Sequence, residues 1–229
     1  MKLARPDVFH PRIVLAGGPQ HPTGDDDDAG LVAALRQRGL HARWMSWDDP
    51  DTAHADLVIL RGTHDYPARL DEFLGWTARV KNLLNPPNVV SWNVDRRYLR
   101  DLKSAGVPTV LDNPTRQSVD PTALIFLGGR PSHAFTGGRP VELEFDVWDL
   151  GSAAIAAAAE HARVDPGGLL YARVDVSGER VAGLDLIAPS LGWARLDTGT
   201  RDLAQREFAL AVESACERLG LGPFSHRRP

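Results

Sequence analysis

Two carboxylates and a guanidinium, those of Asp175, Asp185 and Arg173, have the types and spacing to form a small charged site. Carboxylate oxygens are the hard ligands that a divalent cation takes in proteins, so Asp175 and Asp185 are the candidate metal ligands. The alternative is an ordinary β-sheet with one solvent-facing side, where charged residues are expected. The choice depends on the elements that carry these side chains.

These residues lie on a predicted β-hairpin. Its strands, Leu169–Val176 and Val181–Ile187, are rich in Val, Leu and Ile, and a Ser-Gly pair supplies the turn. Residues two apart on a strand point the same way. A three-residue turn would bring the charged residues of both strands onto one face, and a two-residue turn would not. The sequence leaves this register open.

A second polar group follows a buried strand, Asp56–Leu60, and comprises Arg61, Thr63, His64 and Asp65. In open α/β sheets, ligands bind at the carboxyl ends of the strands, so these four residues are candidate ligand contacts. The alternative is structural: Asp65 would cap the next helix, and His64 would be a surface loop residue.

Alternating strands and helices in the first half of the chain predict a parallel α/β layer. The predicted strands are Arg12–Ala16, His41–Trp47, Asp56–Leu60 and Val89–Ser91, and the predicted helices are Ala29–Arg38, Pro67–Leu84 and one that follows Asp95 and ends at Gly106. The acidic run Asp25–Asp28 could bind a cation or an amine, but capping of the next helix is the commoner use of such residues.

The second half of the chain continues with a predicted hairpin turn at Gly128-Gly129, which places His133 on the returning strand as a structural or substrate-edge residue. Helices are predicted near the end of Trp148–Arg163 and over Thr200–Leu219, the latter a closing amphipathic helix. The α/β first half and the mixed second half together predict an α/β protein.

Composition bounds the function. The 229 residues are 43% hydrophobic and 24% charged, with a net charge of −4 and a pI near 6.0. This balance argues against a nucleic-acid partner. No apolar run approaches the roughly 20 residues that span a bilayer, and no secretory signal is apparent, so a cytoplasmic protein without membrane partners is expected. The single Cys216 is expected in a buried helix face.

Several phrases resemble the ATP-grasp superfamily, in particular the glutathione-synthetase-like and cycloserine-forming cyclo-ligase types. They are the hairpin with Asp175 and Asp185, and the phrases WDDP, RGTHDYPARLDEF, LLNPPNVVSWNVDRRYLRDL and AGVPT between Trp47 and Thr109. The resemblance implies a Rossmann-like pre-ATP-grasp α/β domain over residues 1–108 and a truncated α+β ATP-grasp-like domain over residues 109–229.

The chain departs from the family pattern at several positions. Gly183 stands where the family has a bridging glutamate, Ala188 where close relatives have an acid, His64 where they have Trp, and Arg96 where they have Lys. The lid lobe that holds ATP phosphates through lysines is missing after Thr109, and no lysine follows Lys103. An unbroken chain from Leu111 to Ala123 is expected across the deletion.

The resemblance implies three functions. We expect a protein that binds or processes a small amino-acid-like metabolite in biosynthesis, with a degenerate nucleotide site and no sub-millimolar Mg-ATP binding. The alternatives are an active ATP-dependent carboxylate–amine ligase or cyclo-ligase, which would use Mg²⁺ and ATP and form an acyl phosphate, and a non-catalytic partner of a complete ligase. Whether the chain is an enzyme, and whether it forms a homodimer, stays open.

In relatives, the loop after Leu60 and the hairpin face each other across the substrate cleft. We therefore expect Arg61, His64 and Asp65 to face Arg173 and the hairpin acids across one pocket suited to a zwitterion, with arginine binding a carboxylate and aspartate an amine. His64 is the candidate for proton transfer, because imidazoles titrate near neutrality. The predicted catalytic residues are His64, Asp65 and Arg173, and the predicted substrate contacts are Arg61, Thr63, His64, Arg173 and His133.

Overall fold

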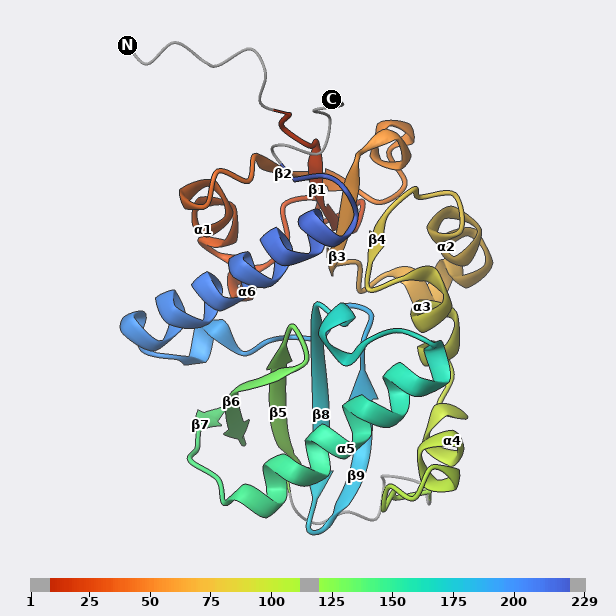
Figure 1. The fold of residues 1–229 in the computed structure, drawn as a ribbon, viewed down its shortest axis with the longest axis vertical. Helices are drawn as coiled ribbons and strands as arrows, with labels where there is room; N and C mark the ends of the chain where they lie inside the picture. The colour runs from red at the N-terminus through yellow and green to blue at the C-terminus, as the bar shows by residue number, and fades with distance from the viewer. Residues whose placement is uncertain (1–8, 112–119, 223–229) are drawn as a thin grey trace.

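The computed structural model describes residues 9–111 and 120–222 and shows two sheets with helices around them (Figure 1). The first sheet is parallel, with strand order β2-β1-β3-β4. Its strands are β1 (Ile13–Gly17), β2 (Ala42–Ser46), β3 (Leu57–Gly62) and β4 (Leu83–Leu84). Strands β1 and β3 are buried along their whole length, as expected for a sheet covered on both faces. The predicted parallel α/β layer is confirmed.

Helices α1 (Leu31–Gln37) and α2 (Leu70–Thr77) accompany this sheet. Helices α3 (Pro87–Asn93) and α4 (Tyr98–Ser104) follow in the chain, and α4 lies beside the second sheet (Figure 1). Two predictions here were wrong. The helix expected over Pro67–Leu84 ends at Thr77. Leu83 and Leu84, which were expected to end that helix, instead form β4 beside β3. The strand expected at Val89–Ser91 is part of α3, which begins at Pro87. Proline suits the first position of a helix, because it needs no backbone N–H there.

The second sheet is antiparallel, with order β7-β6-β5-β8-β9. Its strands are β5 (Thr122–Leu127), β6 (Arg130–Thr136), β7 (Arg139–Pro140), β8 (Tyr171–Ser177) and β9 (Arg180–Asp185). Helix α5 (Phe145–Ala162) crosses one face of this sheet (Figure 1). Both predicted hairpins are present; the first turns at Gly128-Gly129 as predicted, and the second turns one residue later than predicted, at Gly178-Glu179.

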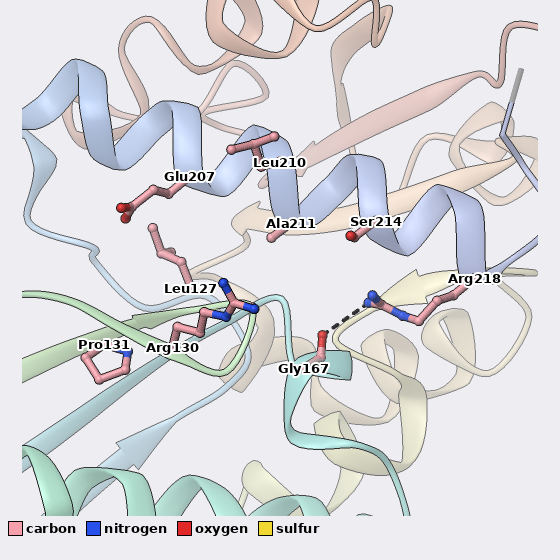
Figure 2. A pocket seen from close by; sticks show the side chains of 10 residues that line it. Leu127, Arg130, Pro131, Gly167, Glu207, Leu210, Ala211, Ser214 and Arg218 are labelled. Carbon is pink, nitrogen blue, oxygen red and sulfur yellow. Dashed lines mark hydrogen bonds between the residues drawn. The ribbon is translucent and has the colours of Figure 1, made fainter.

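The C-terminal helix α6 (Thr198–Arg218) returns to the parallel sheet and packs beside α1 (Figure 1). It also passes over the turn between β5 and β6 (Figure 2). No helix among the described residues is long and apolar enough to cross a membrane.

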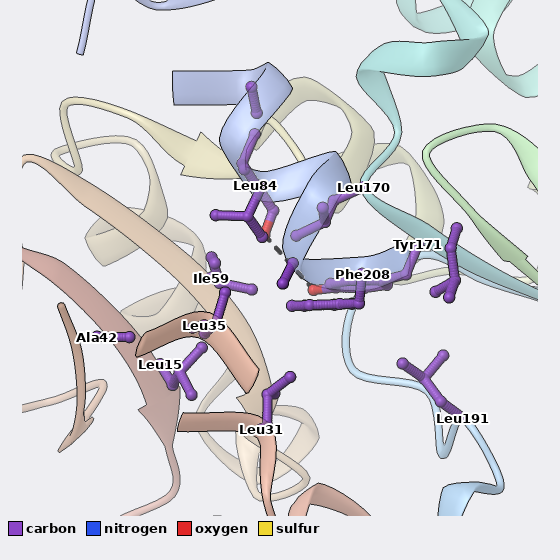
Figure 3. Close-up of a cluster of buried hydrophobic side chains, with 14 of the residues drawn as sticks. Leu15, Leu31, Leu35, Ala42, Ile59, Leu84, Leu170, Tyr171, Leu191 and Phe208 are labelled. Atoms are coloured by element: carbon purple, nitrogen blue, oxygen red, sulfur yellow. Dashed lines mark hydrogen bonds between the residues drawn. The ribbon is translucent and has the colours of Figure 1, made fainter. Parts of the chain in front are cut away.

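One hydrophobic cluster joins the two sheets through α6 (Figure 3). It contains Leu15 and Ile59 of the parallel sheet, Ile125 and Tyr171 of the antiparallel sheet, and Phe208 of α6. The rings of Tyr171 and Phe208 stack with their centroids 6.3 Å apart. Burying side chains of this size removes a large apolar area from water, and this is the main force that holds the sheets together.

Buried hydrogen bonds connect the same two sheets. The Tyr171 hydroxyl lies 2.6 Å from the carbonyl oxygen of Leu60 and 2.8 Å from that of Ile187. The fully buried Asn85 donates to the carbonyls of Tyr171 and Leu186 and accepts from the N–H of Leu170. A buried polar group is tolerated only when it is paired, so these bonds fix how the sheets meet.

Candidate functional site

A cavity of about 900 Å³ opens at the carboxyl ends of β1 and β3, the edge where the sequence predicted ligand contacts. Its size falls in the range of small-molecule sites. It is lined by Gly18, Pro19, Gln20, His21, Gly24, Asp25, Asp26, Gly62, His64, Asp65, Ala68 and Arg69. His64 and Asp65 therefore lie in the cavity, as the position of their loop suggested.

Glycines form much of the cavity wall because the backbone segments approach each other closely. A Cβ atom on Gly18 would lie 2.7 Å from a carboxylate oxygen of Asp65, and one on Gly62 would lie 3.1 Å from the Cα of Gly24. Side chains at these positions would displace the acidic group or the loop. The glycines thus keep Asp65 exposed to the cavity.

Negative charge dominates the cavity. Asp25, Asp26 and Asp65 line it, and a carboxylate oxygen of Asp25 lies 3.7 Å from Nε2 of His64, with both side chains more than half exposed. The Trp47 indole donates to both carboxylate oxygens of Asp65, at 3.2 and 3.1 Å, and so fixes the orientation of this group. Such an acidic cavity, which also holds the imidazoles of His21 and His64, suits a ligand that carries an amine.

Arg69 adds a cation to the cavity, but its charge is already balanced. Its guanidinium donates to Asp48 at 2.7 Å and to both carboxylate oxygens of Glu72, at 2.6 and 2.9 Å. It also lies over the Trp47 ring, 4.5 Å from the centroid. These contacts hold Arg69 in the cavity wall. Arg69 forms no ion pair with the cavity acids Asp25, Asp26 and Asp65.

Arg61, predicted as a substrate contact, is buried away from the cavity. Its side chain is 2% exposed, and Nε donates to a carboxylate oxygen of Asp28 at 2.8 Å. A second donor reaches the carbonyl of Pro189, and the guanidinium lies over the rings of Tyr171 and Trp193. Burial raises the pKa of Asp28, and the charge of Arg61 opposes that rise. This environment is typical of a structural ion pair.

Thr63, another predicted contact, is also fully buried, and its hydroxyl has no hydrogen-bond partner among the described residues. It does not line the cavity. His133 is buried too, and its Nε2 lies 2.6 Å from the carbonyl of Leu191, so Nε2 carries the proton. Burial lowers the pKa of His133. The structure places His133 as a link between β6 and the loop before α6.

The residues of the acidic run have two roles: some line the cavity, and others hold the fold together. Asp25 caps the short helix Asp26–Asp28 by accepting the N–H of Asp27, and Gly30 precedes α1, so the predicted capping of α1 was wrong. The carboxylate of Asp27 accepts from Ser190 and from the N–H groups of Leu191, Gly192 and Ala194. Asp27 thereby holds the loop that leads to α6.

The hairpin has a two-residue turn, Gly178-Glu179, yet its charged residues share one face. The expectation that a two-residue turn would separate them was wrong, because a bulge at Ala182 shifts the register. Arg173 pairs with Asp185, and Asp175 with Gly183. An extra residue in one strand reverses the side-chain alternation beyond it.

The predicted metal ligands are already paired within the hairpin. Arg173 donates to Asp175 at 2.9 Å, and Asp185 accepts the N–H groups of Ile187 and Ala188 at 2.9 and 3.3 Å. Burial raises the pKa of Asp185, although these N–H groups and nearby arginines oppose the rise. Across the described residues, no group of three or more His, Cys, Asp or Glu side chains could hold a metal. This donor set fits Mg²⁺ poorly, because Gly183 adds no side-chain oxygen.

The loop and the hairpin meet, but outside the cavity. The hydroxyl of Tyr171, the first residue of β8, donates to the carbonyl of Leu60 at 2.6 Å, so the end of β3 lies next to the hairpin. None of Arg61, Arg173, Asp175 and Asp185 lines the cavity that holds His64 and Asp65. The prediction of one shared pocket is therefore wrong in that form.

Sequence reasoning did not assign the cavity residues Gly18, His21, Asp25, Asp26 and Arg69 to the site. Two signals were present. A Gly-Gly pair follows β1 directly, at the same sheet edge as the loop after β3, and the acidic run follows within the same connection. Both lie where the switch in strand order around β1 and β3 predicts a ligand crevice.

Comparison with known proteins identifies similar sequences over part of the chain. Residues 13–85 match the family described as D-cycloserine synthetase DcsG, N-terminal domain. The cycloserine biosynthesis protein DcsG of Streptomyces lavendulae is 32% identical over 114 residues. That match covers 47% of this chain and only 38% of the length of DcsG.

Solved structures resemble nearly the whole chain. The crystal structure of D-cycloserine synthetase DcsG matches with a TM-score of 0.77 and 23% identity, covering 90% of this chain and 99% of the other. The D-alanine–D-alanine ligase of Bacillus anthracis, complexed with ATP, matches with a TM-score of 0.59 and 11% identity over 91% and 98% of the two chains. The chain is thus similar to DcsG over part of its sequence, and its fold is ATP-grasp-like.

Proposed function

We propose that this chain binds a small, amine-bearing, amino-acid-like metabolite of a biosynthetic pathway at the carboxyl edge of its parallel sheet, without using a nucleotide. The observation that carries the proposal is the acidic cavity in which Asp25 and Asp65 flank His64. Carboxylates there would bind the ammonium group of the ligand through charge-assisted hydrogen bonds. The likeness to a cycloserine biosynthesis protein supports a ligand of this size and class.

His64 is the residue that we assign to proton transfer or to contact with the acidic group of the ligand. Its imidazole is half exposed in the cavity, and the carboxylate of Asp25 lies near its Nε2. An imidazole N–H can donate a hydrogen bond to a carboxylate or enolate oxygen of the ligand. The predicted role of Arg173 in catalysis or binding needs a ligand that reaches the hairpin face beyond the cavity.

Two observations support the loss of nucleotide use. Thr109 lies beside Val181 of β9 and β5 begins at Thr122, so only residues 110–121 connect these positions. A folded lobe usually needs at least about 50 residues, so no phosphate-holding lid fits in this connection. The second observation is the internally paired hairpin, in which Asp175 is bound to Arg173 and Gly183 offers no ligand atom. Residues 112–119, where chain continuity was predicted, lie outside the described residues.

The test is calorimetric titration of the protein with D-cycloserine, the compound named for the similar synthetase, and with D- and L-amino acids. Asp65→Asn keeps an oxygen for the Trp47 indole and removes the charge, and Asp25→Asn keeps the acceptor for the N–H of Asp27. Each variant should weaken binding about tenfold, as expected for one charge-assisted contact. The matched control is Asp51→Asn, on an exposed residue outside the cavity.

The alternative functions predict different results in the same experiment. An active ATP-dependent ligase requires a clear Mg-ATP isotherm at micromolar concentrations, and that result would overturn the nucleotide-free proposal. A non-catalytic partner of a complete ligase would bind neither D-cycloserine and amino acids nor Mg-ATP. Binding of the small molecule that is equally strong in Asp65→Asn and in the control would place the ligand elsewhere.

A further inference from the structure

A second cavity, of about 350 Å³, lies between α6 and the turn that joins β5 to β6 (Figure 2). The strands contribute Leu127, Gly128, Arg130 and Pro131, and the helix contributes Glu207, Leu210, Ala211, Ser214 and Arg218, with Gly167 at one end. It shares no lining residue with the acidic cavity. Its charge is of the opposite sign, although the whole protein carries a net charge of −4.

Two arginines give this cavity its charge. Figure 2 shows the guanidinium groups of Arg130 and Arg218 directed toward each other beneath Ala211 and Ser214. Arg218 donates to the carbonyl of Gly167 at 3.1 Å and has no carboxylate partner within the described part of the chain. The Arg130 side chain makes no hydrogen bond or ion pair to any described residue, so its fork of donors is free to bind a ligand.

The one acid that lines the cavity, Glu207, does not neutralise these arginines. Its carboxylate accepts a hydrogen bond from the hydroxyl of Ser132 at 3.1 Å, and it stands at the end of the cavity away from Arg218 (Figure 2). The lining therefore carries two positive charges against one negative charge, and the negative charge is engaged. A cavity of this kind attracts an anion.

The rest of the lining is apolar. Leu127, Leu210 and Ala211 line the cavity, and Leu210 is 43% exposed although it sits on a packed helix. The hydroxyl of Ser214 adds one further donor above the arginines. A ligand that matches this surface has an oxyanion at one end and a short apolar group at the other.

We propose that this cavity is a second binding site, for a small organic acid whose oxyanion is held between Arg130 and Arg218 and whose apolar group lies against Leu127 and Leu210. Arginine binds carboxylate and phosphate oxygens through paired N–H donors, which gives both charge and direction to the contact. Occupation of the site ties β6 to α6, the helix that also packs beside α1.

The probe is 4-methylpentanoate, and its neutral counterpart 4-methylpentanamide has the same apolar part. Titrations followed by amide NMR, at ionic strength balanced with chloride, should show saturable binding of the acid at millimolar concentrations and none of the amide. Arg130→Gln should weaken this binding about tenfold or more, since it removes a charge-assisted pair and breaks no bond within the protein. Arg218→Gln should weaken it similarly while an amide donor remains for Gly167.

The matched control is Arg206→Gln, an exposed position on the same helix that does not line the cavity, and it should leave the affinity unchanged. Equal binding of the amide, equal loss in Arg206→Gln, or shifts reproduced by chloride alone would overturn the proposal. Titration with inorganic phosphate separates the two oxyanion sources: a stronger response than to the acid shows that the anion alone is recognised and refutes the apolar contact. The Asp65→Asn variant should bind the acid normally, which keeps this test independent of the first cavity.

Discussion

The acidic run Asp25–Asp28 and the hairpin acids Asp175 and Asp185 are the two places where this chain gathers carboxylates, and their surroundings differ. In the run, Asp27 and Asp28 are buried and hold distant parts of the chain, while Asp25 and Asp26 remain open to a cavity. In the hairpin, both acids are partly buried and bind groups within their own strands or the residues just after.

The difference shows that the number of carboxylates does not identify a site. What matters is whether their oxygens are still free after the fold has formed. The hairpin has the spacing of a metal site, but its oxygens are occupied by Arg173 and by backbone N–H groups. The run looks like a helix cap in the sequence, yet it supplies two acids to the ligand-sized cavity.

Among variants that compare the acidic run with the hairpin, Asp28→Asn is expected to lower the free energy of unfolding most. It leaves the guanidinium of Arg61 buried without its counter-charge, and such a loss costs about 3 to 5 kcal/mol of unfolding free energy. The matched change in the hairpin, Asp175→Asn, breaks a partly exposed pair and should cost about 1 kcal/mol or less. Urea unfolding of both variants measures the contrast, and equal losses would break it.

Asp27→Asn should have the next largest effect. The carboxylate of Asp27 accepts from three backbone N–H groups and a hydroxyl on the loop before α6, and an amide has one oxygen for these donors. A loss of about 2 kcal/mol is expected from unsatisfied buried donors. Asp26→Asn, on an exposed neighbour, is the control. Faster hydrogen exchange at Leu191 and Gly192 in Asp27→Asn alone would locate the change.

The hairpin acids can be tested with a substitution that is expected to create metal binding. A Cβ atom on Gly183 would lie 3.4 Å from an oxygen of Asp175, so Gly183→Glu places a new carboxylate next to an existing one with little rearrangement. We expect the variant to bind Mn²⁺ about tenfold more tightly than the unmodified chain, by electron paramagnetic resonance titration. Gly183→Gln, with the same shape and no charge, should show no gain. Mn²⁺ binding by the unmodified hairpin at low micromolar concentration would contradict our view of these acids as already paired.

The smallest effect concerns pH and the loop that Asp27 holds. Burial lowers the pKa of His133, and the charges of Asp27 and Glu207 oppose this only in part. The unfolded chain therefore takes up the proton first, so stability is full above a pH of about 6.5 and falls as the pH drops below it toward the folded-state pKa. His133→Gln should remove this part of the pH dependence in unfolding experiments, and the exposed His41→Gln should not.

Much of the fold follows from local patterns, and the errors occur where distant contacts decide. The strands before Gly17 and Arg61 and the closing helix were predicted from apolar runs and periodicity. Leu83 and Leu84 form a strand only because β3 offers an edge, and the helix around Val89 starts at a proline that could equally end an element.

The candidate site was predictable only in part. The position of His64 and Asp65 after a buried strand was enough to place them at the ligand edge. The burial of Arg61 was not visible, because its partner Asp28 is 33 residues away in the sequence and the rings around it come from the other half of the chain. The charged residues of the hairpin share one face because of a bulge at Ala182, and the residue types there do not predict a bulge.

The core that joins the two sheets through Tyr171 and Phe208 limits how modular this protein can be. The proposed division into residues 1–108 and 109–229 follows the order of the sheets, but one large hydrophobic cluster takes side chains from both parts and from α6. A gene split at residue 108 would leave the residues of this cluster uncovered in each part, so we expect each fragment alone to be poorly soluble. Complementation on co-expression would restore one protein, because each fragment supplies the missing wall of the other.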